Sequence, residues 1–361
     1  MRHIYVCYLF DFNKGSEWAL GENILPKLKP LDYILCSSQQ LPRETTKVIN
    51  GISYVRVDKK IKIIGLPAVL SSPTSPMQYR FDYLIWVIRT YRKLKRRVSK
   101  NKIQHVNLAQ ILTPIPNCIR NSTNFCFGPV GGQGPWFRVK FMNRSHRIIN
   151  FVLFEIVYKL FRNIIPHNTI FVHPTLAHVF GKKKVDPAIR IKRVEDNKSR
   201  INLKNKKITV VHISRKVYFK LPNLHYKLFL DLANANPDKE FILIGRGWEK
   251  VKSNVKNLTI LEHVTRTDVM NMFKHSHYHV NLSLELAGFV NLEAAQNMCI
   301  TIGAKHTGSD FLLNLNDDQV IDLYEKEMTH TSIFETINGQ IQTYDIETAL
   351  IQDKNASRFY I

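Results

Sequence analysis

Short apolar runs of strand length alternate with amphipathic stretches of helix length along most of this 361-residue chain. In the first half, strand patterns fall at residues 2–9, 33–37, 52–57, 103–108 and 124–128, and helical patterns fall near 17–28, 79–99 and 145–163. In the second half, strand patterns fall at 207–213, 240–245, 259–262, 277–283 and 299–303, and helical patterns at 223–235, 268–274 and 290–297. This alternation is typical of parallel sheets covered by helices, so it predicts an α/β fold.

The chain is too long for one ordinary hydrophobic core, and its length fits two domains. The Lys-rich, weakly periodic stretch 181–207 is the predicted linker. We therefore expect one domain over residues 1–185 and a second over 186–361. Ligands of open α/β sheets bind outside the carboxyl ends of the strands, so motifs that directly follow a strand are the candidates for a site.

Charge is distributed unevenly along the chain, which has a net charge of +23. Residues 1–165 contain 26 Lys and Arg against 8 Asp and Glu, whereas residues 166–361 contain 26 against 21. The densest basic run, 89–102, has no acidic residue and follows an apolar helical pattern. Such a basic half favours an anionic partner, which could be phospholipid, nucleic acid or a phosphorylated substrate.

An anionic membrane surface is the partner that the first half favours, although the basic run could also be a solvated helix end. The apolar stretch 148–165 carries Glu155, Lys159 and Arg162 on one helical face, which indicates an amphipathic helix and not a spanning one. Aromatic residues are not interleaved with Arg and Lys, so we expect no specific nucleic-acid partner. The N-terminus lacks the features of a signal peptide, and we expect a cytoplasmic protein, peripheral on the inner face of the cell membrane.

The five cysteines are scattered, and neither a metal site nor a disulfide framework is predicted from them. We interpret Cys7, Cys36, Cys118, Cys126 and Cys299 as buried thiols in a reducing cytosol.

Two glycine motifs follow predicted strands. Gly15 and Ser16 come after the first strand and open a helix, where the backbone could approach a phosphate at the positive helix end. Gly131 and Gly132 lie in the loop 128–134, which contains four glycines and has little side-chain cover. The alternative for the first motif is a turn that carries glycine for packing only, and the alternative for the second is a flexible connection.

Two cations and two carboxylates complete the candidate site. Arg215 and Lys220 follow a strand and could neutralise the charge that grows on a diphosphate leaving group. Glu285 ends a strand pattern, Gly288 turns the chain, and Glu293 lies about one turn into the next helix. Carboxylates accept hydroxyl bonds from a polyol, and free N–H groups at a helix start can hold a phosphate. A sugar nucleotide needs that combination.

The spacing Glu285-x7-Glu293 resembles the E-x7-E motif of the retaining, GT-B-fold glycosyltransferases of family 4. The resemblance covers nearly the whole chain in the family's order: the GSE start at 15–17 with Gly21, the FGPVGG loop at 127–132, the SR-x4-K spacing at 214–220 and the strand 241–247. It implies two Rossmann-like, doubly wound domains facing a central cleft. It also implies a nucleotide-diphosphate sugar, a UDP- or GDP-sugar, as donor, with no metal and no required cofactor.

By this resemblance, Glu285 contacts hydroxyls of the transferred sugar, Glu293 contacts the nucleotide ribose, and Arg215 with Lys220 binds the diphosphate. His105 matches a histidine that ends an N-domain strand near the reacting carbon, although a lone histidine there is as often structural. The other implied donor-binding positions are Gly15, Ser16, Gly131, Gly132, Gly245, Gly288 and Phe289.

Two departures from the family pattern affect loop shape more than charge. Residues 297–300 read Asn-Met-Cys-Ile where the family has a Gly-x-Pro turn, and Gly288-Phe289-Val290 stands for Gly-Phe-Gly. They leave the base and the sugar open.

The expected function is transfer of a hexosyl or N-acetylhexosaminyl group, with retained configuration, to a lipid-linked saccharide. The acceptor would be polyprenyl-diphosphate-linked, and the setting bacterial surface polysaccharide assembly (capsule, O-antigen or exopolysaccharide). A non-catalytic GT-B-like partner subunit and a sugar-nucleotide epimerase are alternatives. By analogy with the family, the last helix could cross back and pack on the first domain.

Overall fold

The computed structural model describes residues 2–8, 28–37, 46–49, 52–57, 60–66, 76–107, 113–131, 133–186, 201–202, 204, 207–214, 218–248, 251, 253–262, 264–286 and 288–359. The chain divides into two compact units, each with its own sheet. Unit 1 comprises Met1–Gly132 and Ile156–Ala188, and unit 2 comprises Gln133–Glu155 and Ile189–Ile361. The chain therefore enters unit 2 with one short segment, returns to unit 1, and then completes unit 2.

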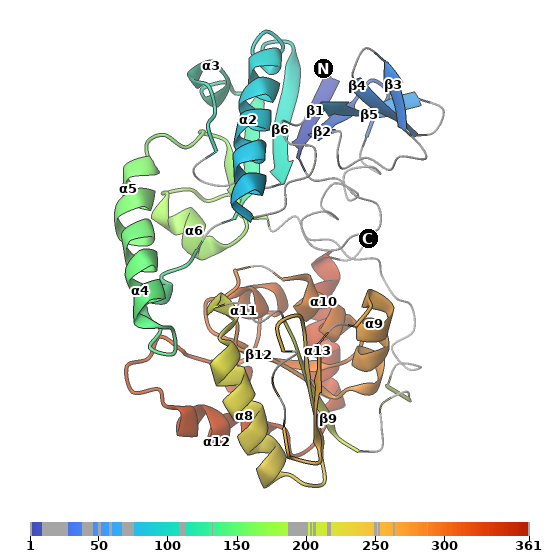
Figure 1. The fold of residues 1–361 in the computed structure, drawn as a ribbon, viewed down its shortest axis with the longest axis vertical. Coiled ribbons are helices and arrows are strands. Elements are labelled where there is room, and N and C mark those ends of the chain that lie inside the picture. The colour runs from blue at the N-terminus through green and yellow to red at the C-terminus, as the bar shows by residue number, and fades with distance from the viewer. Residues whose placement is uncertain are drawn as a thin grey trace. The chain divides into compact units, whose positions relative to one another are not determined.

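Unit 1 contains a mixed eight-stranded sheet with the order β3-β4-β5-β2-β1-β6-β7-β8 (Figure 1). The six strands β5-β2-β1-β6-β7-β8 are parallel to their neighbours. At the other edge, β4 pairs antiparallel with both β3 and β5. Their bounds are β1 Arg2–Cys7, β2 Tyr33–Ser37, β3 Thr46–Ile49, β4 Ile52–Val57, β5 Lys60–Leu66, β6 Asn101–Asn107, β7 Phe125–Val130 and β8 Thr169–Phe171. The parallel part has the order of a doubly wound sheet.

Helix α2, Pro76–Leu94, packs on the unit 1 sheet through one apolar face. Trp86 and Tyr91 are fully buried there, and the Trp86 ring meets Tyr8 edge to face. The opposite face of the helix presents Arg92 and Lys93 to solvent. Unit 1 also contains the shorter helices α3 Asn117–Arg120 and α6 Pro174–Val179.

The predicted helix 145–163 forms as three consecutive helical pieces. They are α4 Arg144–Phe151, a π-helical stretch Val152–Val157 and α5 Tyr158–Phe161. The buried side chain of Asn150 accepts a bond from the Phe137 N–H at 2.8 Å and donates to Gln133 Oε1 at 2.7 Å. These bonds attach α4 to the turn that precedes it.

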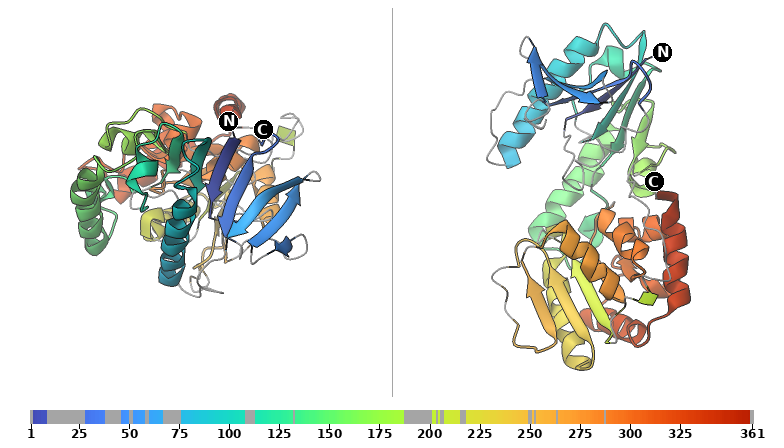
Figure 2. Two further views of the ribbon diagram at one scale, coloured as in Figure 1. Left: turned by 90° about the horizontal axis from the view of Figure 1, so that it is seen from above. Right: turned by 90° about the vertical axis from the view of Figure 1, so that its right-hand side faces the viewer.

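Unit 2 contains a six-stranded sheet with the order β11-β10-β9-β12-β13-β14, and every pair in it is parallel (Figure 2, right). This is the doubly wound order, with the strand order reversing between β9 and β12. The bounds are β9 Thr209–Ile213, β10 Glu240–Ile244, β11 Leu258–Leu261, β12 Tyr278–Asn281, β13 Ile300–Ala304 and β14 Val320–Ile321.

Helices cover both faces of the unit 2 sheet. One face packs on α8 and α12 through a core that includes Leu228, Phe229 and Ile337, and the other packs on α9 and α10 through Phe273 and Ala294. The bounds are α8 Pro222–Ala235, α9 Arg266–His275, α10 Phe289–Gln296, α11 Gly308–Leu313, α12 His330–Gln340 and α13 Ile346–Ala356. The alternating apolar pattern of the sequence thus produces the expected α/β architecture.

Several sequence expectations differ from the structure in detail. Helix α9 begins after Thr265 and not after Thr267, because Thr265 and Asp268 form a reciprocal capping box. Of the two strands in the antiparallel edge, the sequence predicts only 52–57, and β3 is not predicted. Strand β12 ends at Asn281, so Glu285 lies in the following loop. Cys118 is exposed and Cys126 is partly exposed, whereas the other three thiols are buried.

Among the described residues, no helix combines the length and the apolar character needed to cross a membrane. The predicted helix near 17–28 falls almost entirely outside the described residues.

Candidate functional site

The topological switch point of unit 2 lies between β9 and β12, which are neighbours in the sheet. The connection after β9 leads to one side of the sheet and the connection after β12 leads to the other. Ligands of doubly wound sheets bind in the crevice that this reversal creates. The segments after β9 and after β12 therefore form the natural place for a site.

Two stacked, buried histidines hydrogen-bond to the backbone of these segments. The rings of His212 on β9 and His225 on α8 lie 3.7 Å apart between centroids, at 16°. His225 Nε2 accepts the Leu282 N–H at 3.0 Å, so its proton resides on Nδ1 and is donated to Leu221 O at 3.1 Å. Burial lowers the pKa of His225 to about 4, which keeps the ring neutral.

His212 has the same tautomer for a similar reason. Its Nδ1–H faces Val280 O at 2.7 Å, and its Nε2 accepts from the Ser214 hydroxyl at 2.8 Å. Burial, together with the neighbouring His225, holds the pKa of His212 well below its usual value. Sequence reasoning missed both histidines because each lies inside an apolar pattern that predicts core.

Lys220 is buried at the end of a 3₁₀ turn, Tyr218–Lys220, that precedes α8. The turn is held on the loop after β12, because Phe219 O accepts the Leu284 N–H at 2.8 Å. The Phe219 ring also stacks on Trp136, with centroids 5.6 Å apart and planes at 20°. These contacts bring the Lys220 ammonium to the loop that carries Glu285.

Glu285 contacts Lys220 through a charge-assisted hydrogen bond from Nζ to Oε2. Its backbone carbonyl accepts the Gly308 N–H at 2.7 Å, which anchors the loop to α11. Its carboxylate also lies against Gly288, the N-cap residue of α10, since a Cβ there would stand 3.3 Å from Oε2. The sequence prediction that Lys220, Glu285 and Gly288 come together is consistent with this geometry.

Glu293 lies one turn into α10, as expected from the sequence, and is mostly buried. Burial raises the pKa of its carboxyl group, and the charge of Arg266 opposes that rise. Arg266 Nη2 donates to Glu293 Oε1 at 2.7 Å. Nothing in the sequence pattern pointed to Arg266, because its partner lies 27 residues away on another helix.

Four other predicted positions lie outside the described residues, and a fifth lies within them. Gly15, Ser16, Arg215 and Gly132 lie outside the described residues. Gly131 is partly exposed, and a Cβ added to it would meet nothing within 4 Å.

Two further predicted positions occupy the ends of secondary-structure elements. Gly245 directly follows β10 with a φ of 146°, a conformation that favours glycine. Phe289 is the first residue of α10.

His105 lies inside β6 of unit 1 and has no exposed surface. Its Nδ1 is 2.6 Å from the Tyr91 hydroxyl and its Nε2 is 3.3 Å from the Tyr83 hydroxyl. A ring held at both nitrogens inside a core supports the structural alternative that the sequence left open.

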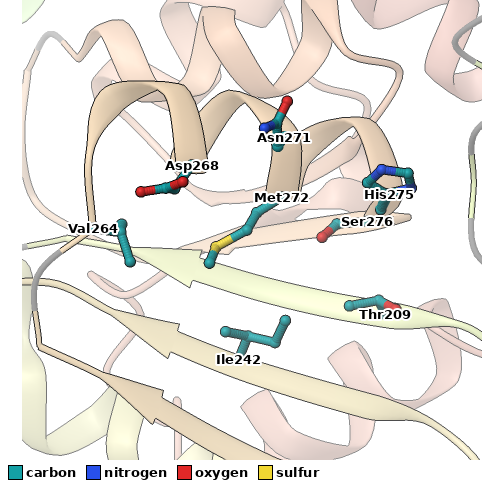
Figure 3. Close-up of a pocket in the computed structure, with 8 residues that line it drawn as sticks. All are labelled: Thr209, Ile242, Val264, Asp268, Asn271, Met272, His275 and Ser276. Atoms are coloured by element: carbon teal, nitrogen blue, oxygen red, sulfur yellow. The ribbon is translucent and has the colours of Figure 1, made fainter.

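A pocket of about 520 Å³ lies between α9 and the sheet of unit 2 (Figure 3). It is lined by Thr209, Ile242, Val264, Asp268, Asn271, Met272, His275 and Ser276. None of the predicted site residues lines it. The pocket runs along α9, from Val264 and Asp268 at the start of that helix to His275 and Ser276 at its end, where it reaches Thr209 at the start of β9.

The sequence matches no family model, and a sequence search finds no match among curated proteins. Solved structures, in contrast, are similar over nearly the whole chain. The α,α-trehalose-phosphate synthase (UDP-forming) of Burkholderia vietnamiensis has a TM-score of 0.63 at 11% identity, covering 99% of this chain and 95% of that one. WaaG, a glycosyltransferase involved in lipopolysaccharide biosynthesis, has a TM-score of 0.54 at 11% identity, covering 98% and 95%.

A third similar structure is the trehalose-6-phosphate enzyme of E. coli bound with UDP-2-fluoro glucose. It has a TM-score of 0.56 at 11% identity, and 99% of each chain is covered. These similarities establish the fold of the chain as the GT-B fold of glycosyltransferases, in agreement with the sequence resemblance.

Proposed function

We propose that the chain is a nucleotide-sugar-dependent glycosyltransferase whose donor binds at the switch point of unit 2. The contact between Lys220 and Glu285 at the start of α10 carries this proposal. It joins a cation suited to a diphosphate with a carboxylate suited to sugar hydroxyls, beside a helix N-terminus that favours anions. The GT-B fold of the chain is consistent with that use.

Each residue then has a defined role. Glu285 accepts bonds from hydroxyls of the transferred sugar, and Glu293 accepts them from the ribose. Lys220 and Arg215 bind the diphosphate. The glycines and small residues at 15, 16, 131, 132, 245 and 288, with Phe289, allow close backbone approach. His105 receives a structural role because its ring is enclosed in the core of unit 1.

The proposed reaction breaks the bond between the anomeric carbon and the diphosphate oxygen and forms a bond from that carbon to an acceptor hydroxyl oxygen. The acceptor hydroxyl proton leaves with the nucleoside diphosphate or to solvent. Attack from the face that the leaving group vacates retains the configuration. Lys220 and Arg215 stabilise the negative charge that develops on the leaving group, which is where fixed charges act most strongly.

The donor assignment is tested by thermal unfolding with UDP, GDP, ADP and CMP. A nucleotide at about 100 times its dissociation constant stabilises a protein by roughly 2.7 kcal/mol. We expect one nucleotide to raise the melting temperature, and Glu293→Ala to abolish that rise. The matched control is Glu335→Ala, which removes an exposed glutamate from α12. Absence of a shift with all four nucleotides would refute the donor site.

Product analysis separates the alternatives that share the fold. A transferase releases nucleoside diphosphate only with acceptor present, and the sugar appears on the acceptor. An epimerase changes the sugar nucleotide without an acceptor, and a non-catalytic partner subunit gives neither product.

For the acceptor side we propose a lipid-linked saccharide at an anionic membrane surface, as in bacterial surface polysaccharide assembly. The helical segment 144–161 supports this setting, because it exposes a row of aliphatic side chains spaced four residues apart. Ile148, Val152, Ile156 and Leu160 are each 43–68% exposed. Monomeric soluble proteins rarely present such contiguous apolar surface.

The charges that flank this row favour an anionic bilayer over a second copy of the chain. The segment carries Arg144, Arg147 and Lys159, with Arg162 directly after it, and Glu155 is its acidic residue. A self-association through the row would bring like charges together. Each basic side chain near an anionic leaflet contributes on the order of 1 kcal/mol, and the apolar row adds burial in the interface.

Vesicle flotation tests this surface independently of turnover. We expect binding to vesicles that contain phosphatidylglycerol, weaker binding to pure phosphatidylcholine, and release by added salt. Ile149→Glu, at another exposed position of α4, should reduce binding, whereas Ile351→Glu on the exposed face of α13 should not. Equal binding by both variants would show that the segment does not contact the membrane.

A further inference from the structure

Arg266 and Glu293 form an ion pair that links the start of α9 to α10 beside the proposed donor site. Arg266 is the first residue of α9 and Glu293 is the fifth residue of α10. The Arg266 side chain is 59% exposed, whereas the Glu293 side chain is 11% exposed. The bond joins Nη2 to Oε1 and leaves Oε2 as a second acceptor.

The position of Arg266 requires an explanation, since a cation in the first turn of a helix opposes the helix dipole. The start of α9 is fixed one residue earlier by the Thr265–Asp268 capping box, in which the Thr265 N–H donates to Asp268 Oδ2 at 3.0 Å. The backbone of Arg266 therefore has little freedom. Its side chain compensates for the unfavourable location by pairing with the buried carboxylate.

The chemistry of Glu293 depends on that pairing. An ionised carboxylate can accept two hydroxyl bonds, whereas its protonated form must use one oxygen as a donor. Burial favours the protonated form, and the charge and hydrogen bond of Arg266 favour the ionised one. Within the described structure, α10 itself carries no other charged side chain, and on α9 Asp268 is engaged by Thr265.

We propose that Arg266 is a positioning residue for the donor nucleotide: it fixes the Glu293 carboxylate through Oε1, so that the carboxylate can accept the two ribose hydroxyls as an anion. This inference rests on the proposed function and adds a residue to its site. Arg266 acts through Glu293 and needs no contact of its own with the reacting atoms. Its effect should therefore appear in nucleotide affinity and in the pH dependence of that affinity.

The test measures affinity for the nucleotide identified in the thermal screen, at about pH 6 and about pH 8, by titration calorimetry. In Arg266→Gln, the pKa of Glu293 rises, so we expect affinity to fall more at the lower pH than at the higher one. Arg266→Lys retains the charge and should restore much of the affinity at both pH values. Lys354→Gln, which removes an exposed cation from α13, is the matched control.

The double variant provides the decisive comparison. If Arg266 acts through Glu293, then Arg266→Gln should have no further effect in a Glu293→Gln background. Additive losses, or a loss in Arg266→Gln that is equal at both pH values, would overturn the proposal.

A readout without nucleotide distinguishes this failure from failure of the donor site. The pH dependence of unfolding should differ between the wild type and Arg266→Gln only while Glu293 is present. If the wild type binds none of the nucleotides, the proposed function fails and Arg266 loses this role with it. If the wild type binds and Arg266→Gln matches it at both pH values, only the role of Arg266 is refuted.

Discussion

Lys220 Nζ and Glu285 Oε2 are in direct contact, although 65 residues separate them in the chain. The contact is possible because β9 and β12 are neighbours at the point where the strand order of unit 2 reverses. The Lys220 side chain is largely buried and that of Glu285 is about one-third exposed. The pair therefore has one partner held by the fold and one that faces outward.

This arrangement predicts different effects for the two members of the pair. Glu285→Gln keeps the shape of the side chain and should lower turnover by about 100-fold or more, while nucleotide affinity changes little. Lys220→Met should weaken nucleotide binding as well, because the ammonium contacts the diphosphate. Initial rates and calorimetric titration measure the two effects. Full activity in Glu285→Gln would show that the Glu285 carboxylate has no role in the reaction.

Buried histidines should make the fold sensitive to acid. The pKa of His225 is about 4 in the folded protein, below its ordinary value near 6.5, so the unfolded chain binds more protons between these values. The contribution of neutral His225 to the free energy of unfolding is fully present above about pH 6.5 and is lost as pH falls toward 4. We expect unfolding free energy to decrease over this window by up to about 1.4 kcal/mol per pH unit for each such histidine.

Replacing His225 or His279 by leucine separates the contribution of burial to the free energy of unfolding from that of hydrogen bonding. His225→Leu removes the side-chain acceptor of the Leu282 N–H and one of the two donors to Leu221 O, and should destabilise by about 2–4 kcal/mol at neutral pH. His279 is equally buried, but neither ring nitrogen has a hydrogen-bond partner in the described structure. His279→Leu should therefore be neutral or stabilising and should flatten the acid slope. Urea unfolding at several pH values provides the comparison.

Lys204 connects the segment before β9 to the helices that flank the site. Its ammonium donates to Phe273 O at 3.1 Å and Ser276 O at 2.5 Å at the end of α9, and to Asn297 O at 2.7 Å after α10. Lys204→Met should remove one donor from each of these carbonyls and destabilise unit 2 by roughly 2–4 kcal/mol. Lys207→Met, at an exposed position nearby, is the control. Equal urea midpoints for both variants would show that water replaces the ammonium at little cost.

The secondary structure of unit 2 was predictable because its strands and helices have clear apolar periods and short connections. Only the strand 52–57 of the antiparallel edge was predicted, since β3 has just four residues and β5 carries two lysines and a glycine among its seven. Helix α9 begins at Arg266, two residues before the predicted range 268–274, because the capping box of Thr265 with Asp268 fixes its start.

The sequence by itself determined the α/β class, most strands and helices of unit 2, and the positions of Lys220 and Glu285 in the segments that follow strands. These features depend on periodicity and on local turn chemistry, which are properties of neighbouring residues. Tertiary structure decided which residues touch: that Lys220 pairs with Glu285, that Arg266 pairs with Glu293, and that His212 stacks on His225. Such pairs depend on strand order and helix packing, which bring distant parts of the chain together and leave no local pattern in the sequence.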